Sequence, residues 1–161
     1  MAESWTRPVP GGGRAPSTRT PGGPSWPRRR ADVRTAPGPE LLDRLDRERI
    51  VWLCTLRRDG SPHLTPVWYL FRDDGWWIAT TERTVKARNV AADPRVSLAL
   101  PDGMAPVVAE GTAVIRYAPF PPEVVEGLRR RYDGWDITDS AGPDGDYVLL
   151  RVTVTRWLLT G

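Results

Sequence analysis

The chain has 161 residues, enough for one domain and a terminal extension. Its charge is unevenly distributed. Residues 1–40 carry seven arginines and three acidic residues, a net charge of +4, whereas residues 41–161 carry sixteen basic and seventeen acidic residues, a net charge of −1. The positive excess therefore belongs to the N-terminal segment, and no basic face that would indicate nucleic-acid binding can be assigned to the remainder.

The counts of cysteine and histidine and the hydropathy pattern exclude several further classes of protein and site. A single cysteine, Cys54, rules out an intrachain disulfide and fits a reducing compartment. The N-terminus lacks the apolar core of a secretory signal, and no run approaches the ~18 apolar residues of a membrane span. A cytoplasmic protein without a membrane anchor is therefore expected. With one histidine and one cysteine, a zinc site would have to rely on carboxylates, so no metal site is predicted.

Residues 1–38 differ in composition from the rest of the chain. They contain seven of the seventeen prolines, six of the fifteen glycines and the run Arg28-Arg29-Arg30. Apolar side chains are too few to offset the entropy of ordering, so the segment is predicted to be a disordered tail on a domain at 39–161. Binding of a partner or nucleic acid through this tail is the alternative.

The first predicted elements are a helix and a hairpin strand. Glu40–Glu48 places its leucines on one face and has a proline at its start, which predicts a short amphipathic helix. Ile50–Arg57 predicts a strand, and Asp59-Gly60 is a strong hairpin signal after it.

Two further strands continue this hairpin. Pro62–Phe71 is rich in β-branched and aromatic residues, Asp73-Asp74-Gly75 predicts a turn, and Trp76–Thr81 predicts the next strand. Three strands joined by tight turns indicate an antiparallel meander.

The second half alternates helices and strands. The predicted elements are a helix at Thr84–Ala92 stopped by Asp93-Pro94, strands at Arg95–Leu100 and Val107–Tyr117 with a candidate bulge at Gly111, a helix at Pro121–Tyr132, a loop at Asp133–Asp146, and a last strand at Asp146–Leu158. Six strands with short helices over ~120 residues favour a mainly β fold, a closed six-stranded barrel, because closure removes exposed edges.

Lys86 is the single lysine among 23 basic residues. It lies at the start of a predicted helix that Thr84 can cap, just after a strand ending in Thr80-Thr81. Hydroxyls, free helix N–H groups and one ammonium are what a bound phosphate needs. A lysine at a helix N-terminus is unfavourable against the dipole by a few tenths of a kcal/mol, and a phosphate reverses that sign. The alternative is an ordinary solvated surface charge.

Other candidate residues have ordinary structural explanations. His63, the only histidine, fits packing or hydrogen bonding better than catalysis. Tyr69 and Tyr117 could orient a substrate. Trp68 and Trp157 could flank a ring system or pack in the core.

One tryptophan of the pair Trp76-Trp77 is expected in the core, and the other could face a partner subunit. The run Arg129-Arg130-Arg131 predicts a solvated helix end that is favourable to the dipole.

Three segments together resemble a known family. They are DGSPHLTPVWY at 59–69, TTERTVKARNV at 80–90 and DPRVSL at 93–98. The chain resembles, over residues 40–157, the split-barrel flavin-binding superfamily typified by pyridoxamine 5′-phosphate oxidase. Within it the chain looks most similar to the actinobacterial branch that uses the deazaflavin coenzyme F420. The resemblance implies a six-stranded split β-barrel with short flanking helices.

The resemblance also implies which residues hold the cofactor. Four of them would lie on the strand whose backbone lines the ring, namely Thr65, Pro66, Val67 and Trp68. The others would approach or clamp the phosphate, with Val85 using its backbone: Thr80, Thr81, Thr84, Val85 and Lys86. Pyridoxamine phosphate oxidases usually carry an arginine where Val85 stands, and their C-terminal substrate-binding segment has no clear counterpart here. Oxidation of a pyridoxamine phosphate ester is therefore not expected.

The expected protein is a homodimer with cofactors in two grooves at the subunit interface. Its implied activity is two-electron transfer between coenzyme F420 and an unsaturated small molecule, whose identity the loops at 101–106 and 133–146 do not reveal. Water can serve as the proton donor. The alternatives are an FMN-dependent oxidase or reductase of the same fold and a non-catalytic flavin-binding protein. The Arg129-Arg130-Arg131 run could alternatively contact the polyglutamate tail of the deazaflavin.

Overall fold

The computed structural model describes residues 37–139, 142 and 144–160. The predicted tail therefore lies, up to residue 36, outside the described residues. The described elements are α1 (Pro39–Arg47), β1 (Ile50–Leu56), β2 (Pro62–Arg72), β3 (Gly75–Thr81), α2 (Val85–Ala92), β4 (Arg95–Ala99), β5 (Val107–Arg116), α3 (Pro122–Arg131) and β6 (Tyr147–Thr160). Each predicted helix and strand is confirmed, with ends that differ by no more than two residues.

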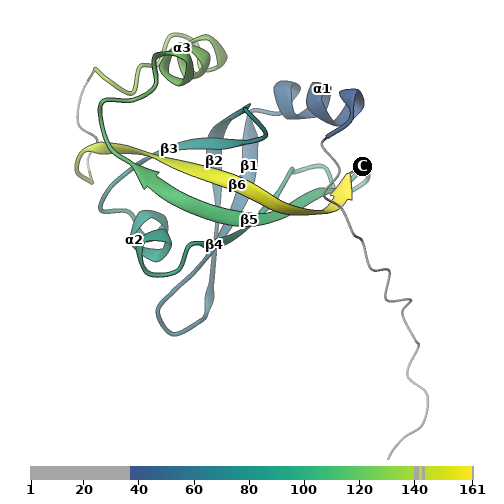
Figure 1. The fold of residues 1–161 in the computed structure, drawn as a ribbon, viewed down its shortest axis with the longest axis horizontal. Coiled ribbons are helices and arrows are strands. Elements are labelled where there is room, and N and C mark those ends of the chain that lie inside the picture. The colour runs from purple at the N-terminus through teal and green to yellow at the C-terminus, as the bar shows by residue number, and fades with distance from the viewer. Residues whose placement is uncertain (1–36, 140–141, 143, 161) are drawn as a thin grey trace, which may run out of the picture. The chain divides into compact units, whose positions relative to one another are not determined.

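The strands close into a barrel in the order β1-β2-β3-β6-β5-β4 (Figure 1). All neighbouring pairs are antiparallel, so the predicted meander of β1, β2 and β3 and the predicted closure are both confirmed. The register between β5 and β6 shifts at Glu110/Gly111, which confirms the bulge predicted at Gly111. Among the described residues, no helix combines the length and the apolarity needed to cross a membrane.

The turn between β2 and β3 uses two aspartates in the left-handed region. Asp73 and Asp74 have φ values of 52° and 55°, and Arg72 pairs directly with Gly75. This is a two-residue hairpin loop, whose twist matches that of the flanking strands. Gly75 is required for a different reason. A Cβ there would collide with the carbonyl oxygen of Val152 in β6.

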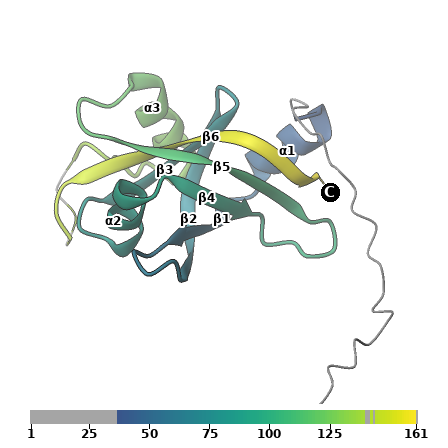
Figure 2. The same cartoon turned by 60° about the horizontal axis from the view of Figure 1, so that its bottom comes forward.

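The main core fills the barrel. Trp76, Phe71 and Trp157 form an aromatic cluster inside it, with 5.3 Å between the ring centroids of Trp76 and Trp157. Leu45 of α1 and Val90 of α2 join the same core, and Figures 1 and 2 show these two helices on opposite sides of the barrel. Of the two uses considered for Trp157, core packing is therefore confirmed.

A second core lies between α3 and the outer face of the barrel. Val124 and Leu128 of α3 are fully buried, and Trp77 packs against this cluster. Trp77 therefore faces α3 rather than a partner subunit, while Trp76 is in the core as expected.

The prediction that the arginines at the end of α3 are solvated is wrong for Arg131. The Arg131 side chain is only 8 % exposed, and it donates to the carbonyl oxygens of Leu45, Asp46 and Glu48 at the C-terminal end of α1. Those carbonyls have no partner within α1, and the guanidinium supplies one. Arg130 remains exposed, as predicted.

Candidate functional site

The candidate site lies where β2 and β3 separate. These strands pair only over Tyr69–Arg72 and Gly75–Ile78, although β2 begins at Pro62 and β3 continues to Thr81. Beyond the paired part each strand keeps its other neighbour, β1 or β6. The gap holds a pocket of about 340 Å³. The residues that line it are Ile50, Pro66, Val67, Trp68, Ala79, Thr80, Lys86, Trp135 and Tyr147.

Separation of the strands leaves part of the β2 backbone facing the pocket. The Tyr69 N–H donates to the Tyr132 hydroxyl over 2.7 Å, and this hydroxyl lies 2.9 Å from the carbonyl oxygen of Arg49, just before β1. The peptide groups of Tyr69 therefore face β1. Because these groups alternate along a strand, those of Trp68 and the Pro66 carbonyl face the gap. A planar heterocycle in the gap would meet both a donor and acceptors.

Threonine hydroxyls form the end of the pocket next to α2. Thr84 caps this helix by accepting from the Ala87 N–H, as predicted, and its own hydrogen goes to the Thr81 carbonyl oxygen, 2.9 Å away. The 3.1 Å contact between the Thr80 and Thr84 hydroxyls must then be donated by Thr80. The lone pairs of Thr80, which lines the pocket, stay free for a ligand donor.

Lys86 projects into this pocket from the first turn of α2. It is partly buried, and this burial lowers the pKa of its ammonium, an effect that Asp144 opposes in part. It is not among the ion pairs formed by the described residues. A partly desolvated cation without a close counter-charge, at a helix N-terminus, is favourable only if an anion joins it.

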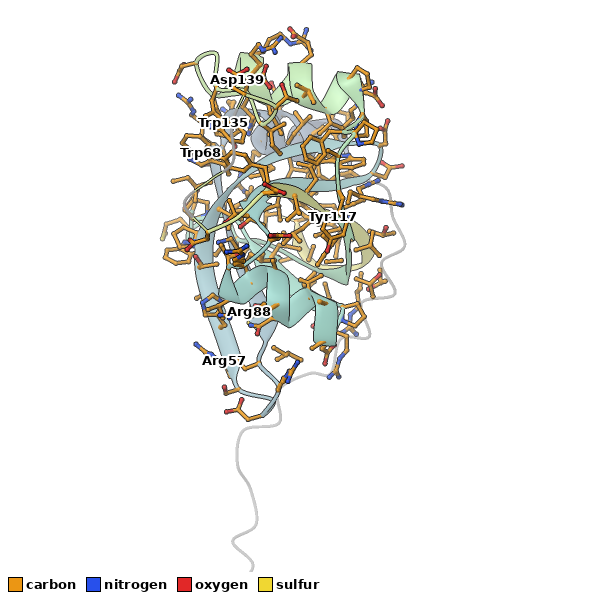
Figure 3. All side chains as sticks on the ribbon, turned by 90° about the vertical axis from the view of Figure 1, so that its left-hand side faces the viewer. Arg57, Trp68, Arg88, Tyr117, Trp135 and Asp139 are labelled. Carbon is orange, nitrogen blue, oxygen red and sulfur yellow. The ribbon has the colours of Figure 1, made fainter. Side chains whose placement is uncertain are left out.

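Aromatic rings form the wall across from α2. Trp68 stacks on Tyr132 with 4.4 Å between ring centroids and 6° between ring planes. Trp135 meets Trp68 edge-on, with 5.9 Å between ring centroids (Figure 3). It also meets Tyr147 edge-on, with 5.5 Å between ring centroids. Sequence reasoning missed Trp135 and Tyr147. The one signal for Trp135 is that it is a lone tryptophan in a loop rich in aspartate and glycine.

Five of the nine predicted site residues line the pocket: Pro66, Val67, Trp68, Thr80 and Lys86. A sixth, Thr84, contacts Thr80. The other three lie outside the lining. Thr65 is on the inward side of β2, and its hydroxyl donates to the Pro66 carbonyl oxygen. Thr81 is buried, and the Val85 side chain is exposed at the start of α2.

The two tyrosines considered for substrate orientation lie elsewhere. The Tyr69 hydroxyl is buried and donates to the Leu45 carbonyl oxygen over 2.9 Å, so it cannot reach a ligand. Tyr117 lines a separate pocket of about 560 Å³ with Glu82 and Asp146. Figure 3 shows Tyr117 well away from Trp68.

A closed antiparallel barrel with a pocket between two separating strands is the split barrel of flavin-binding proteins. A model of the Pyridoxamine 5'-phosphate oxidase family matches residues 38–161, and the chain belongs to this family. The predicted resemblance is thus confirmed. The chain has the flavin-binding oxidoreductase fold of that family.

Solved structures similar to the chain have diverse descriptions. A conserved hypothetical protein of Mycobacterium tuberculosis, Rv2991, is 33% identical over 80% of this chain and 86% of its own, with a TM-score of 0.61. An F420 reductase is 26% identical over 70% of this chain and 91% of its own, with a TM-score of 0.58. The heme storage protein HutZ from Vibrio cholerae shares the fold at 16% identity, with a TM-score of 0.64 over 79% of this chain and 96% of its own. No curated protein sequence matches the chain.

Proposed function

We propose that this protein is an oxidoreductase that transfers two electrons between coenzyme F420 and an unsaturated small molecule bound beside it. The observation that carries the proposal is the partly buried Lys86 ammonium, which lies at the end of a pocket lined by the β2 backbone. Family membership and the similarity to an F420 reductase support the class of cofactor.

The pocket residues fit a phosphorylated ring coenzyme. Peptide groups at Pro66 and Trp68 are positioned to hydrogen-bond the edge of the ring, and Val67 supplies apolar contact. Lys86 would hold the phosphate, and the Thr80 hydroxyl would join it by turning its hydrogen from Thr84 to a phosphate oxygen. The deazaflavin supplies the hydride, so the protein needs to bind, orient and exclude water rather than provide an acid–base pair.

Removal of the lysine tests the proposal. Lys86→Ala is expected to fold normally and to bind the cofactor about 10- to 100-fold more weakly, because a charge-assisted contact of about 1.5–3 kcal/mol is lost. Arg88→Ala, an exposed cation on the same helix, is the matched control and should change the dissociation constant less than about twofold. Fluorescence titration with purified coenzyme measures both. Equal affinities in the two variants would contradict the proposal.

The same titration separates the alternatives. FMN would use the same lysine and the same backbone contacts, so the two coenzymes are titrated in parallel. Micromolar binding of FMN with none of coenzyme F420 would reverse the cofactor assignment. Tight binding without turnover across enones, quinones and tetrapyrroles would instead indicate a non-catalytic flavin-binding protein.

The proposed active form is a homodimer. On the outer face of β1 and β2, every position is uncharged from Ile50 to Leu56 and from Pro62 to Trp68. We call these residues the neutral strip: Ile50, Trp52, Cys54, Leu56, Pro62, Leu64, Pro66 and Trp68. Several are large and exposed, including Leu64 at 60% and Trp68 at 45%. An exposed apolar patch of this kind typically marks a contact surface.

A second copy of the chain suits the neutral strip better than a charged partner does. At a two-fold axis each residue meets the same surface on the other subunit, so a charged strip would repel itself and a neutral one does not. Ile50 and Trp68 belong both to the strip and to the pocket wall. A partner on the strip would therefore cover the mouth of the pocket and exclude water from it.

A further inference from the structure

His63 lies against the face of α2 that carries Lys86. The Asn89 side chain, three residues after Lys86 on α2, donates to the Thr55 hydroxyl over 3.0 Å. Thr55 pairs with His63 across β1 and β2, and its hydroxyl lies 3.5 Å from the His63 carbonyl oxygen. Residues three apart share a helix face. These contacts therefore bring the Lys86 side of α2 next to His63.

A second cation approaches His63 from the end of β1. The Arg57 guanidinium donates to the Pro62 carbonyl oxygen over 2.6 Å, which holds it beside the start of β2. Figure 3 shows Arg57 near the end of the hairpin. The acid of this turn, Asp59, is engaged by the N–H and hydroxyl of Ser61, at 2.9 and 2.7 Å. Its carboxylate is thus held by its own turn and forms no close ion pair with Arg57 or Lys86 among the described residues, although the charge of Arg57 still helps to lower the pKa of Asp59.

The imidazole itself is incompletely satisfied. The Nδ1 atom of His63 is buried and has no hydrogen-bond partner among the described residues. Burial lowers the pKa of His63, and the positive charges of Arg57 and Lys86 lower it further. A packed histidine of ordinary kind would use its ring nitrogens on protein groups. Here a buried, unpaired nitrogen lies close to two cations, an arrangement that a bound anion would stabilise.

We propose that His63 is the ionisable member of an anion site that it forms with Arg57 and Lys86: the imidazole is neutral without ligand and takes up a proton when a multiply charged anion binds. The proposal rests on the proposed function in one respect, since the natural anion would be the acidic part of the same coenzyme. Because linkage is reciprocal, an anion that raises the proton affinity of His63 also binds more tightly as the pH falls.

The experiment uses the fact that the chain has one histidine. In the untagged full chain, the imidazole signals in an NMR pH titration belong to His63 alone. The titration is run in saturating sodium sulfate, which stays doubly charged throughout, and in sodium chloride of equal ionic strength. Sulfate is expected to raise the proton affinity of His63 about tenfold, a shift of about one pKa unit. An unchanged midpoint overturns the proposal.

Three variants check the assignment. Arg57→Gln and Lys86→Met should each raise the pKa of His63 in chloride, because each removes a like charge, and should shrink the response to sulfate. His63→Gln should bind sulfate with an affinity that no longer rises between about pH 7.5 and pH 5.5. A pH dependence that persists in His63→Gln would place the proton elsewhere and overturn the proposal.

Failure of the anion-site proposal can be distinguished from failure of the proposed function. The histidine titration is repeated on the same protein saturated with coenzyme F420. If the coenzyme binds and the His63 midpoint does not move, the proton-linked anion site is excluded and the oxidoreductase proposal stands. If sulfate moves the midpoint but neither coenzyme binds, the anion site stands and the cofactor assignment falls.

Discussion

Lys86 and His63 place a partly buried ammonium and a partly buried imidazole close together, and both have a lowered pKa. Neither arrangement stabilises the folded chain by itself, because the charged form of each group is disfavoured by burial. Such positions are retained where a ligand supplies the missing counter-charge. At these two residues, the features that favour ligand binding therefore lower the stability of the protein without ligand.

The stability of the protein should consequently depend on pH through His63. In the unfolded chain the imidazole titrates near its ordinary value of 6.5, and in the folded protein it titrates lower. As the pH falls through 6.5 the unfolded chain gains a proton that the folded protein does not, so acid favours unfolding. Denaturant titrations at pH 7.5 and 5.5 should show wild type losing more stability than His63→Gln. Parallel losses in the two proteins would show that the folded pKa is not lowered.

At the scale of the element, local signals determined most of the fold. The Asp59-Gly60 hairpin, the Thr84 cap and the Asp93-Pro94 stop all lie where the sequence predicts them, because each acts on the backbone within a few residues of itself. Residues whose role depends on distant partners were not predictable in this way. Trp135 contacts Trp68 and Tyr147 across elements that are distant in the chain, and no spacing in the sequence reports these contacts.

Arg131 shows the same limit within a single helix. Three successive arginines at a helix end look alike in sequence, yet only the third reaches the carbonyl end of α1, where it also lies 4.9 Å over the Tyr69 ring. Among the described residues, the side-chain hydrogen bonds from α3 to the end of α1 all come from this one guanidinium. It therefore connects two elements that are separated in sequence by all of β1 to β5.

Replacement of this arginine tests the connection. Arg131→Met keeps the apolar length of the side chain but leaves the carbonyl oxygens of Asp46 and Glu48 without this donor, and it should lower the free energy of unfolding by about 2–4 kcal/mol. Arg130→Met, whose wild-type side chain is 71% exposed, is the control and should change it by less than about 0.5 kcal/mol. Chemical denaturation measures both. Similar small effects would mean that the helices are held by their leucines alone.

At the scale of the whole molecule, the barrel separates a structural interior from a functional exterior. On β2 the inward position Tyr69 belongs to the core, and the outward positions Pro66 and Trp68 belong to the pocket and the neutral strip, while Val67 belongs to the core and also borders the pocket. Strand alternation thus gives neighbouring residues of one segment different parts in core and site. The sequence resemblance at 59–69 covers both sets, which is why it indicated fold and site together.

The neutral strip predicts the oligomeric state. One chain has a mass of 18.0 kDa, and light scattering after size exclusion should find twice that value for the wild type. Leu64→Glu introduces a charge that would meet its own copy across the two-fold axis, so this variant should elute as a monomer. It should also bind coenzyme more weakly, because the pocket mouth loses its cover.

The matched control is Val114→Glu, at an exposed apolar position of β5 outside the strip. It should keep the mass and the coenzyme affinity of the wild type. If Leu64→Glu remains a dimer with unchanged affinity while Val114→Glu becomes a monomer, the subunits meet on the β5 side of the barrel instead. Loss of the dimer in Leu64→Glu without loss of affinity would show that each pocket binds its ligand with residues of one chain only.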